Sequence, residues 1–196
     1  MPPREKREIL DIFTLGDLID RAIVFLTASS RVPMLSLQKG IFLYLYSYAI
    51  TKGYDFSKLL KLAAFEPFKY GPFSDMVAGQ AETLVGDGTI EREGSGERYT
   101  FIGTFQNLKK YNFDEDEERL LKNVKNLVET LDPLELTFYI YFNPLIDESL
   151  RKYFTSNSEI KDRLINNKEK YIKSLLKKGV IDDKTADLIL YGSNQS

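Results

Sequence analysis

The chain has 196 residues, of which 29% are charged and 43% hydrophobic, and its formal net charge is −2. This composition is typical of a globular protein, and the near-neutral charge gives no general attraction to nucleic acid or anionic lipid. Histidine and cysteine are absent, which excludes disulfides, thiolate nucleophiles and the commonest transition-metal ligands, so we expect no enzyme, no metal site and no cofactor.

The N-terminal sequence MPPREKREIL carries charges but has no apolar run long enough for a signal peptide. No later stretch reaches the roughly 18 apolar residues that a membrane-spanning helix needs. We therefore expect a cytoplasmic protein that makes no contact with a membrane.

Two helices are predicted in the first part of the chain. Apolar residues follow the helical period from about Thr14 and leave charged residues on the opposite face, which indicates an amphipathic helix. The next helix, from Ser36 to Lys52, is apolar on almost every side, so we expect it to lie buried at the centre of the fold. Pro33 precedes it, Ser36 is its predicted N-cap, and Gly53 is its predicted left-handed C-cap.

Ser36 and Lys39 form an S-x-x-K pair, the spacing of one motif of penicillin-binding proteins and β-lactamases. The companion motifs S-D-N and K-T-G do not occur in the chain. A helix N-cap explains the serine without catalysis. An enzyme that uses carboxylates and Lys39 is therefore the least favoured interpretation.

A short helix over residues 56–62 leads into the segment AAFEPFKYGPFSD, residues 63–75. Pro67 and Pro72 exclude a regular helix or a central strand between them, and Gly71 permits a sharp turn, which predicts a loop. Four aromatic residues crowd this loop: Phe65, Phe68, Tyr70 and Phe73. They are either core residues or, because the prolines pre-order the loop, a surface that presents Tyr70 to a partner while Phe73 anchors the next helix.

Ser74 is predicted to cap a third helix over about residues 75–85. Strands are predicted at residues 89–91 and 98–102, joined by the glycine-containing turn EGSGE. Three helices followed by a two-stranded hairpin is the order of elements in a winged helix. We therefore predict a mainly α protein whose residues 11–112 form a winged-helix-like domain.

The segments LQKGIFLYLYSY and FEPFKYGPFSDMVAGQAETLVGDGTIE resemble the SocA/Panacea-type antitoxins and related small prokaryotic proteins. The resemblance covers about residues 15–102 and rests on Leu37, Gln38, Lys39, Tyr70, Gly71, Pro72, Leu84, Gly88 and Ile90. The chain departs from the family pattern at Gly40 and Phe42, at Phe73 after the YGP sequence, and in its long C-terminal extension. The resemblance implies a non-catalytic regulatory or adaptor domain, often encoded beside a toxin.

Residues 113–196 are predicted to be helical throughout. Asp114 begins a helix whose first turn, EDEE, indicates either a hard-metal site or compensation of the helix dipole, and we favour compensation. Asp132, Pro133 and Glu135 are typical of the start of an apolar helix, which Asn143 ends.

Two further helices are predicted at residues 147–154 and 158–178. Gly179 and Val180 fit the end of a Schellman motif, and Asp183 is the predicted cap of the last helix. This C-terminal region either packs as a second layer or forms a homodimer contact.

A winged helix usually reads DNA with its third helix, but SDMVAGQAETLVGD contains no lysine or arginine and has three acids. Gln80 is its sole base-reading candidate. A DNA-binding variant would depend on the hairpin and the residues after it, through Arg92, Arg98, Lys109 and Lys110. We therefore expect DNA binding to be weak.

The favoured interpretation is a non-enzymatic, antitoxin-like regulatory adaptor that binds a partner protein, such as a toxin, through the aromatic loop and the third helix. The residues predicted to contact the partner are Phe68, Lys69, Tyr70, Gly71, Pro72, Phe73 and Gln80. The alternative is a winged-helix transcriptional regulator that binds DNA through its wing as a dimer.

Overall fold

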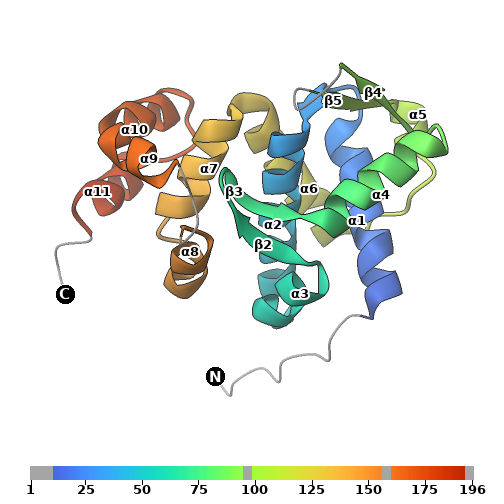
Figure 1. Cartoon of the computed structure of the whole chain (residues 1–196), viewed down its shortest axis with the longest axis horizontal. Helices are drawn as coiled ribbons and strands as arrows, with labels where there is room; N and C mark the ends of the chain where they lie inside the picture. The colour runs from blue at the N-terminus through green and yellow to red at the C-terminus, as the bar shows by residue number, and fades with distance from the viewer. Residues whose placement is uncertain (1–10, 95–98, 156–159, 193–196) are drawn as a thin grey trace.

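The computed structural model describes residues 11–94, 99–155 and 160–192, and the fold is mainly helical, as predicted. The long helix α2 runs through the middle, and α1, α6 and α7 pack around it (Figure 1). These four helices have the bounds Ile12–Thr27 (α1), Met34–Lys52 (α2), Glu115–Thr130 (α6) and Pro133–Phe142 (α7).

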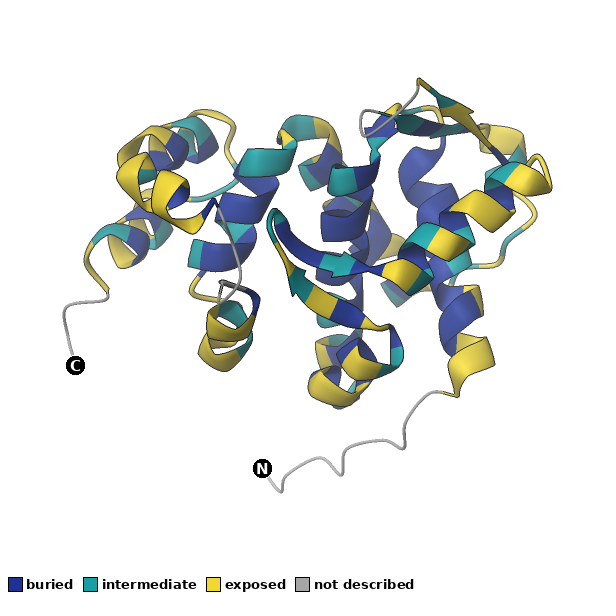
Figure 2. Cartoon of the chain, viewed as in Figure 1, coloured by how far each residue is buried: buried dark blue, intermediate teal, exposed yellow. Residues whose placement is uncertain are grey.

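Helix α2 is buried on opposite sides, which confirms the prediction of a central helix. Leu37, Ile41, Phe42 and Tyr44 are all inaccessible to solvent, and Figure 2 shows buried residues gathered between α1, α2 and α7. Gly53 ends the helix in the left-handed conformation, as predicted.

The predicted N-cap of α2 is wrong. Pro33 occupies the cap position, and Ser36 lies buried inside the first turn of the helix. Since Pro33 has a φ of −59° and cannot donate a backbone hydrogen bond, it suits the position directly before a helix, and the helix starts earlier than the serine indicates.

Helix α2 approaches α1 and α6 closely at Gly40. A Cβ atom built on this glycine would lie 2.8 Å from Cγ2 of Val128 and 3.0 Å from Cδ1 of Leu26. Real Cβ atoms keep longer distances to side chains in a close-packed core. Gly40 therefore sets the distance between α2 and its two neighbours.

The acidic first turn of α6 is held by hydrogen bonds and ion pairs. Asp114 and Glu117 form a capping box, and Glu117 also pairs with Arg21 of α1 at 2.6 Å. Lys52 of α2 lies 3.0 Å from Asp114 and 3.1 Å from Asp116. Among the described residues no group of three or more acids could hold a metal ion. These carboxylates thus join α6 to α1 and α2.

In the described ranges, two small antiparallel sheets accompany the helices. One has the strand order β1-β5-β4, in which Arg92 of β4 lies opposite Phe101 of β5. The turn between these strands, with Arg98, lies outside the described residues. The elements of this part of the chain are β1 (Val32–Pro33), α4 (Asp75–Gly86), β4 (Ile90–Glu93), β5 (Thr100–Gly103) and α5 (Phe105–Leu108).

The C-terminal helices lie at one end of the molecule, beyond α7 (Figure 1). The helix predicted over residues 158–178 is interrupted at Asn167, and the last helix is capped by Asp182 instead of Asp183. The Schellman motif is confirmed, because Gly179 and Val180 donate their backbone N–H groups to Leu176 and Leu175. The bounds are Glu148–Thr155 (α8), Lys161–Asn166 (α9), Lys168–Lys177 (α10) and Asp183–Tyr191 (α11).

The apolar core is continuous across the predicted domain boundary near residue 112. Val124 and Val128 of α6 belong to the same cluster as Leu37 and Ile41 of α2. The division into residues 11–112 and 113–196 stays a prediction. No helix in the described part of the chain is both long enough and apolar enough to cross a membrane.

We predict that Gly40→Ala destabilises the protein by about 1–3 kcal/mol, because the added methyl group overpacks the contact with Val128 and Leu26. Gly79→Ala in α4 is the matched control, since nothing lies within 4 Å of its Cβ position, and it should stabilise by up to about 1 kcal/mol through helix propensity. Urea unfolding of both variants measures the two changes. Equal effects would contradict the close approach at Gly40.

Candidate functional site

The segment predicted to be an irregular aromatic loop is a β-hairpin, formed by β2 (Phe65–Phe68) and β3 (Gly71–Ser74). It crosses in front of α2 in the view of Figure 1, with α8 on one side and α3 (Phe56–Leu62) on the other. The two prolines exclude a central strand and therefore predicted a loop. Both strands of a two-stranded sheet are edge strands, however, and proline is tolerated there.

Pro67 and Pro72 lie directly opposite each other in the hairpin. In an antiparallel ladder, opposite residues either exchange two hydrogen bonds or point their N–H groups away from each other. Two prolines have no N–H to exchange, so Pro67 and Pro72 form a pair without hydrogen bonds. The neighbouring pairs, Glu66–Phe73 and Phe68–Gly71, are then the hydrogen-bonded ones. The proline nitrogens consequently lie on the two outer edges of the hairpin, where an added strand would need donors.

Gln38 of α2 binds the base of the hairpin. Its amide is fully buried, donates to the carbonyl of Ser74 at 3.0 Å and accepts from the N–H of Ser74 at 2.9 Å. The Ser74 hydroxyl donates to the Ala63 carbonyl and accepts from the N–H of Val77, which confirms Ser74 as the cap of α4. The side-chain amide of Gln38 thus makes the two backbone hydrogen bonds with Ser74 that a neighbouring strand would otherwise make.

The aromatic residues of the hairpin divide between its two faces. Phe65 is buried and meets Phe42 edge to face, with ring centroids 5.6 Å apart. Phe68 is 47% exposed, and its ring lies 5.3 Å from that of the half-buried Phe73. We call the side chains of Glu66, Phe68 and Phe73 the outer face of the hairpin. Phe73 therefore belongs to the surface more than to the core, contrary to its predicted role as an anchor of the next helix.

Tyr70, predicted to be the presented anchor, is half-buried and packs against the core. The hydroxyl of Thr137 in α7 lies 3.2 Å from the Tyr70 carbonyl and 2.7 Å from the Pro133 carbonyl, and the two carbonyls share its one proton. The Lys69 ammonium group lies 5.1 Å from the centre of the Tyr70 ring. Gly71 and Pro72 are buried. The turn is therefore held against α7, and Phe68 is the aromatic residue of the hairpin that is most exposed.

Lys39 lies beneath this turn and is only 1% exposed. A Cβ built on Gly71 would be 3.4 Å from Cε of Lys39 and 3.5 Å from the hydroxyl of Tyr141 in α7. No hydrogen bond or ion pair joins the Lys39 amine to any residue that the structure describes. Burial away from compensating charge lowers the pKa of Lys39 to about 7.

The fold thus brings together two segments that are distant in the sequence, the first turns of α2 and the β2–β3 hairpin. Gln38 and Lys39 meet the segment around Gly71 and Ser74 through the contacts given above. Neither role was predicted from the sequence. Two polar residues in succession within an otherwise apolar helix are the signal that indicates buried polar contacts.

Gln80, a predicted contact residue, is half-buried on α4. Its Nε2 atom lies 3.1 Å from the position that a Cβ on Gly16 of α1 would occupy. The amide therefore packs against α1, away from the outer face of the hairpin. This position suits neither base reading nor the partner contact predicted for it.

The predicted DNA-binding cations are only partly available. Arg92 pairs with Glu82 of α4 at 3.0 Å and lies 5.5 Å from the Tyr99 ring. Lys109 lies over the ring of Phe105 at 5.5 Å, and Lys110 is exposed. An arginine that is paired with an acid adds little attraction for phosphate.

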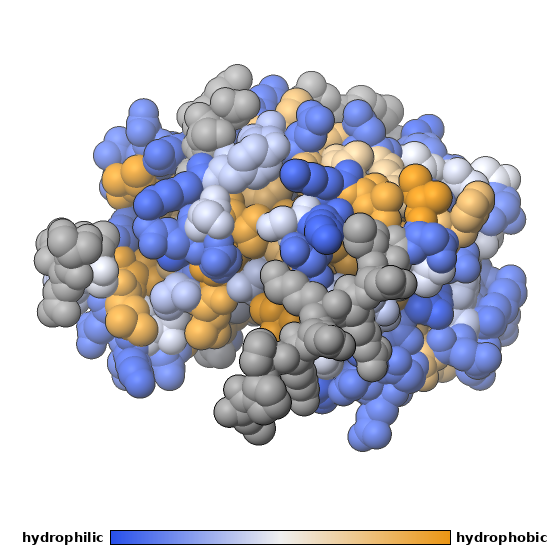
Figure 3. Space-filling view, turned by 90° about the horizontal axis from the view of Figure 1, so that it is seen from below, coloured by the Kyte–Doolittle hydropathy of each residue, from blue (hydrophilic) through white to orange (hydrophobic). Residues whose placement is uncertain are grey.

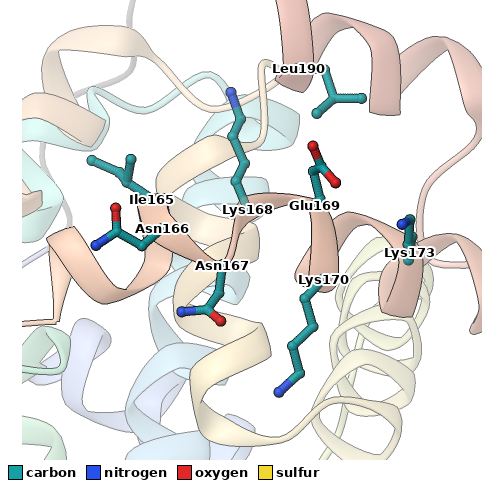
Figure 4. A pocket seen from close by; sticks show the side chains of 8 residues that line it. All are labelled: Ile165, Asn166, Asn167, Lys168, Glu169, Lys170, Lys173 and Leu190. Carbon is teal, nitrogen blue, oxygen red and sulfur yellow. The ribbon is translucent and has the colours of Figure 1, made fainter.

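A second feature is a cleft of about 740 Å³ between α9, α10 and α11, lined by Lys168, Lys170 and Lys173 (Figure 4). The three lysine side chains point apart in this view, so they do not converge on one anion. Lys168 instead lies 5.8 Å from the centre of the Phe142 ring. The cleft lacks the convergent polar groups of a small-molecule site.

Comparisons with protein-family models, with curated proteins and with solved structures found no match to the chain. The resemblance to SocA/Panacea-type antitoxins stays a prediction that depends on the quoted residues.

We predict that Gln38→Leu destabilises the protein by about 2–4 kcal/mol, because both backbone groups of Ser74 lose their partner in a buried place. Gln38→Glu should cost less than Gln38→Leu if its carboxyl group binds the N–H of Ser74. Urea unfolding followed by circular dichroism ranks the three proteins. A Gln38→Leu variant as stable as the wild type would show that the hairpin is held by other contacts.

Proposed function

We propose that this protein is a non-enzymatic regulatory adaptor that binds a partner protein through the outer face of the β2–β3 hairpin. The observation that carries the proposal is the contact between the exposed Phe68 and the half-buried Phe73, on a hairpin whose base and turn are both bound to the fold. Exposed aromatic residues on a pre-ordered surface are typical of the residues that dominate binding energy.

The construction of the hairpin favours recognition through side chains. Bonds from Gln38 and Thr137 hold the two ends of the hairpin, so little conformational entropy is lost when a partner binds. Pro67 and Pro72 leave both edges without a donor at the centre of the hairpin, which disfavours the addition of a partner strand. The partner is therefore expected to cover the rings of Phe68 and Phe73.

The wider arrangement supports a winged-helix-like unit within residues 11–112, made of α1, α2 and α4 with the sheet β1-β5-β4 as the wing. We include this unit, a cytoplasmic location and an antitoxin-like role in the proposal. The resemblance supports the antitoxin-like role, and the absence of cysteine fits a reducing compartment. The pairing of Arg92 with Glu82 places the DNA-binding alternative second.

On the face seen from below, apolar side chains form separate patches among hydrophilic ones (Figure 3). Leu188 and Tyr191 of α11 are 48% and 66% exposed, which supports keeping a homodimer contact through the C-terminal helices in the proposal.

We predict that Phe68→Ala weakens partner binding by about 2 kcal/mol or more, the scale of a binding hot spot, and leaves the melting temperature nearly unchanged. The partner is recovered from an extract of the native cells with the wild-type protein, identified, purified and titrated against each variant. Phe105→Ala on α5 is the matched control, because Phe105 is 59% exposed but lies outside the hairpin.

Tyr70→Ala separates stability from binding. Since Tyr70 packs against the core, this variant should lower the melting temperature. The adaptor proposal fails if Phe68→Ala and Phe105→Ala bind the recovered partner as tightly as the wild type does.

We also predict that DNA binding is weak and is lost at about 150 mM salt, because the acidic α4 repels phosphate. Fluorescence anisotropy with labelled duplexes over a salt series measures it. Nanomolar, sequence-selective binding at that salt concentration would favour the transcriptional regulator instead.

A further inference from the structure

The buried Lys39 side chain lies beside groups that cannot balance a positive charge. Gly71 of the hairpin turn covers it from one side, and Thr137 and Tyr141 of α7 approach the same point within 3.2 Å and 3.5 Å of the Gly71 Cβ position. Gly71 has a φ of +99°, which permits this close approach and disfavours any side chain there. A neutral amine is tolerated in such a place, whereas an ammonium ion without a partner is costly.

We propose that the β2–β3 hairpin is a lid over the Lys39 amine, which closes over the uncharged form and opens more readily when the amine is charged. The contacts that close the lid are the two bonds between Gln38 and Ser74, the bond from Thr137 to the Tyr70 carbonyl, the ring contact of Phe65 with Phe42, and the packing of the turn.

The titratable groups around α2 do not offer Lys39 a counter-charge. Strand β3 has no ionisable residue, and Glu66 of β2 is exposed on the outer face. Tyr141 of α7 faces the amine, but its hydroxyl donates to the Phe154 carbonyl at 3.1 Å. Glu135 of α7 is bound by Ser174 and Lys178.

The charged groups on the other elements around α2 and the hairpin are engaged elsewhere or exposed. Among the charged groups of α1, α2 and α6, Arg21 pairs with Glu117, Lys52 pairs with Asp114 and Asp116, and Asp17 is exposed. On α4, Glu82 pairs with Arg92 and Asp75 is exposed. Lys58 and Lys61 of α3 are exposed, and on α8 Lys152 pairs with Glu148 while Arg151 donates to the Ile146 carbonyl. The half-buried Asp20 of α1 has its pKa raised to about 6 by burial and by Asp17 and Asp87, and no acid contributes to the shift of Lys39.

The direction of the pH effect follows from the two states of the lid. Burial lowers the pKa of Lys39 to about 7 when the lid is closed, whereas a solvated lysine has a value near 10.4. Between these values only the open state binds the proton, so the equilibrium constant for opening rises about tenfold for each unit of pH decrease. Below about pH 7 both states bind the proton, and opening becomes independent of pH.

The inference extends the proposed function, because the lid carries Phe68 and Phe73. Opening separates these residues from the contacts that fix their position, so a partner that recognises the closed hairpin should bind more tightly as the pH rises from 7. This effect on partner binding rests on the proposed function, whereas the lid itself is tested without any partner.

The experiment is hydrogen–deuterium exchange of the full chain between pH 6 and pH 10, analysed for peptides covering residues 63–76 and corrected for intrinsic exchange rates. We expect protection in the wild type to rise about tenfold per pH unit above pH 7 and to level off below it. In Lys39→Met, which replaces the amine with an apolar group of similar length, protection should be high at every pH. Lys58→Met, on the exposed side of α3, should behave as the wild type does.

A direct titration of the Lys39 side chain by NMR of protein labelled at lysine Cε completes the test and needs no variant. A pKa near 10 overturns the inference. So does a pH dependence of protection that is the same in Lys39→Met and in the wild type. Failure of Phe68→Ala to weaken partner binding would remove the adaptor function but leave these results standing, so the two proposals fail separately.

Discussion

The burial of residues 36–45 of α2 on every side is the constraint on which the other contacts depend. A helix without a solvent-facing side cannot turn a polar group toward water, so each such group needs a partner from the chain. Gln38 obtains two from the backbone of Ser74, and the Tyr44 hydroxyl lies 3.4 Å from the carboxylate of Glu117. Lys39 is the exception, and the hairpin that covers it is consequently the part of the fold where stability depends on a charge state.

The same constraint explains why the second half of the chain is part of the core. The faces of α2 that α1, α3 and the hairpin leave open are covered by α6 and α7, and Gly40 permits α6 to approach closely. Arg21 and Lys52 extend from α1 and α2 to the first turn of α6 and are neutralised there. Apolar packing and ion pairing thus join the same pair of segments, which are far apart in the sequence.

The features that could be predicted from the sequence are those whose signals are local. Gly53, Ser74, the pair Asp132 and Glu135, and the turn at Gly179 each act within a few residues of their own position, and the structure has them where the sequence indicates. These signals fixed the main helices and therefore most of the secondary structure.

The missed features depend on contacts between distant residues. The pairing of Pro67 with Pro72 depends on strand register, which two helix-breaking residues do not reveal. The division of the hairpin into a buried Phe65 and an exposed Phe68 follows from the faces of that pairing, whereas Tyr70, predicted to be the presented residue, is half-buried in the turn. The role of Gln38 requires knowledge of a backbone 36 residues away.

The facing prolines also bear on how the protein behaves at high concentration. Exposed aromatic residues on a two-stranded sheet are a hazard in most proteins, because free strand edges let copies of a chain assemble edge to edge into aggregates. Pro67 and Pro72 remove a donor from each edge of this hairpin at the same level, and the Gln38 amide occupies the next position on β3. Two prolines and one buried amide therefore oppose edge-to-edge assembly at a surface that carries two phenylalanines.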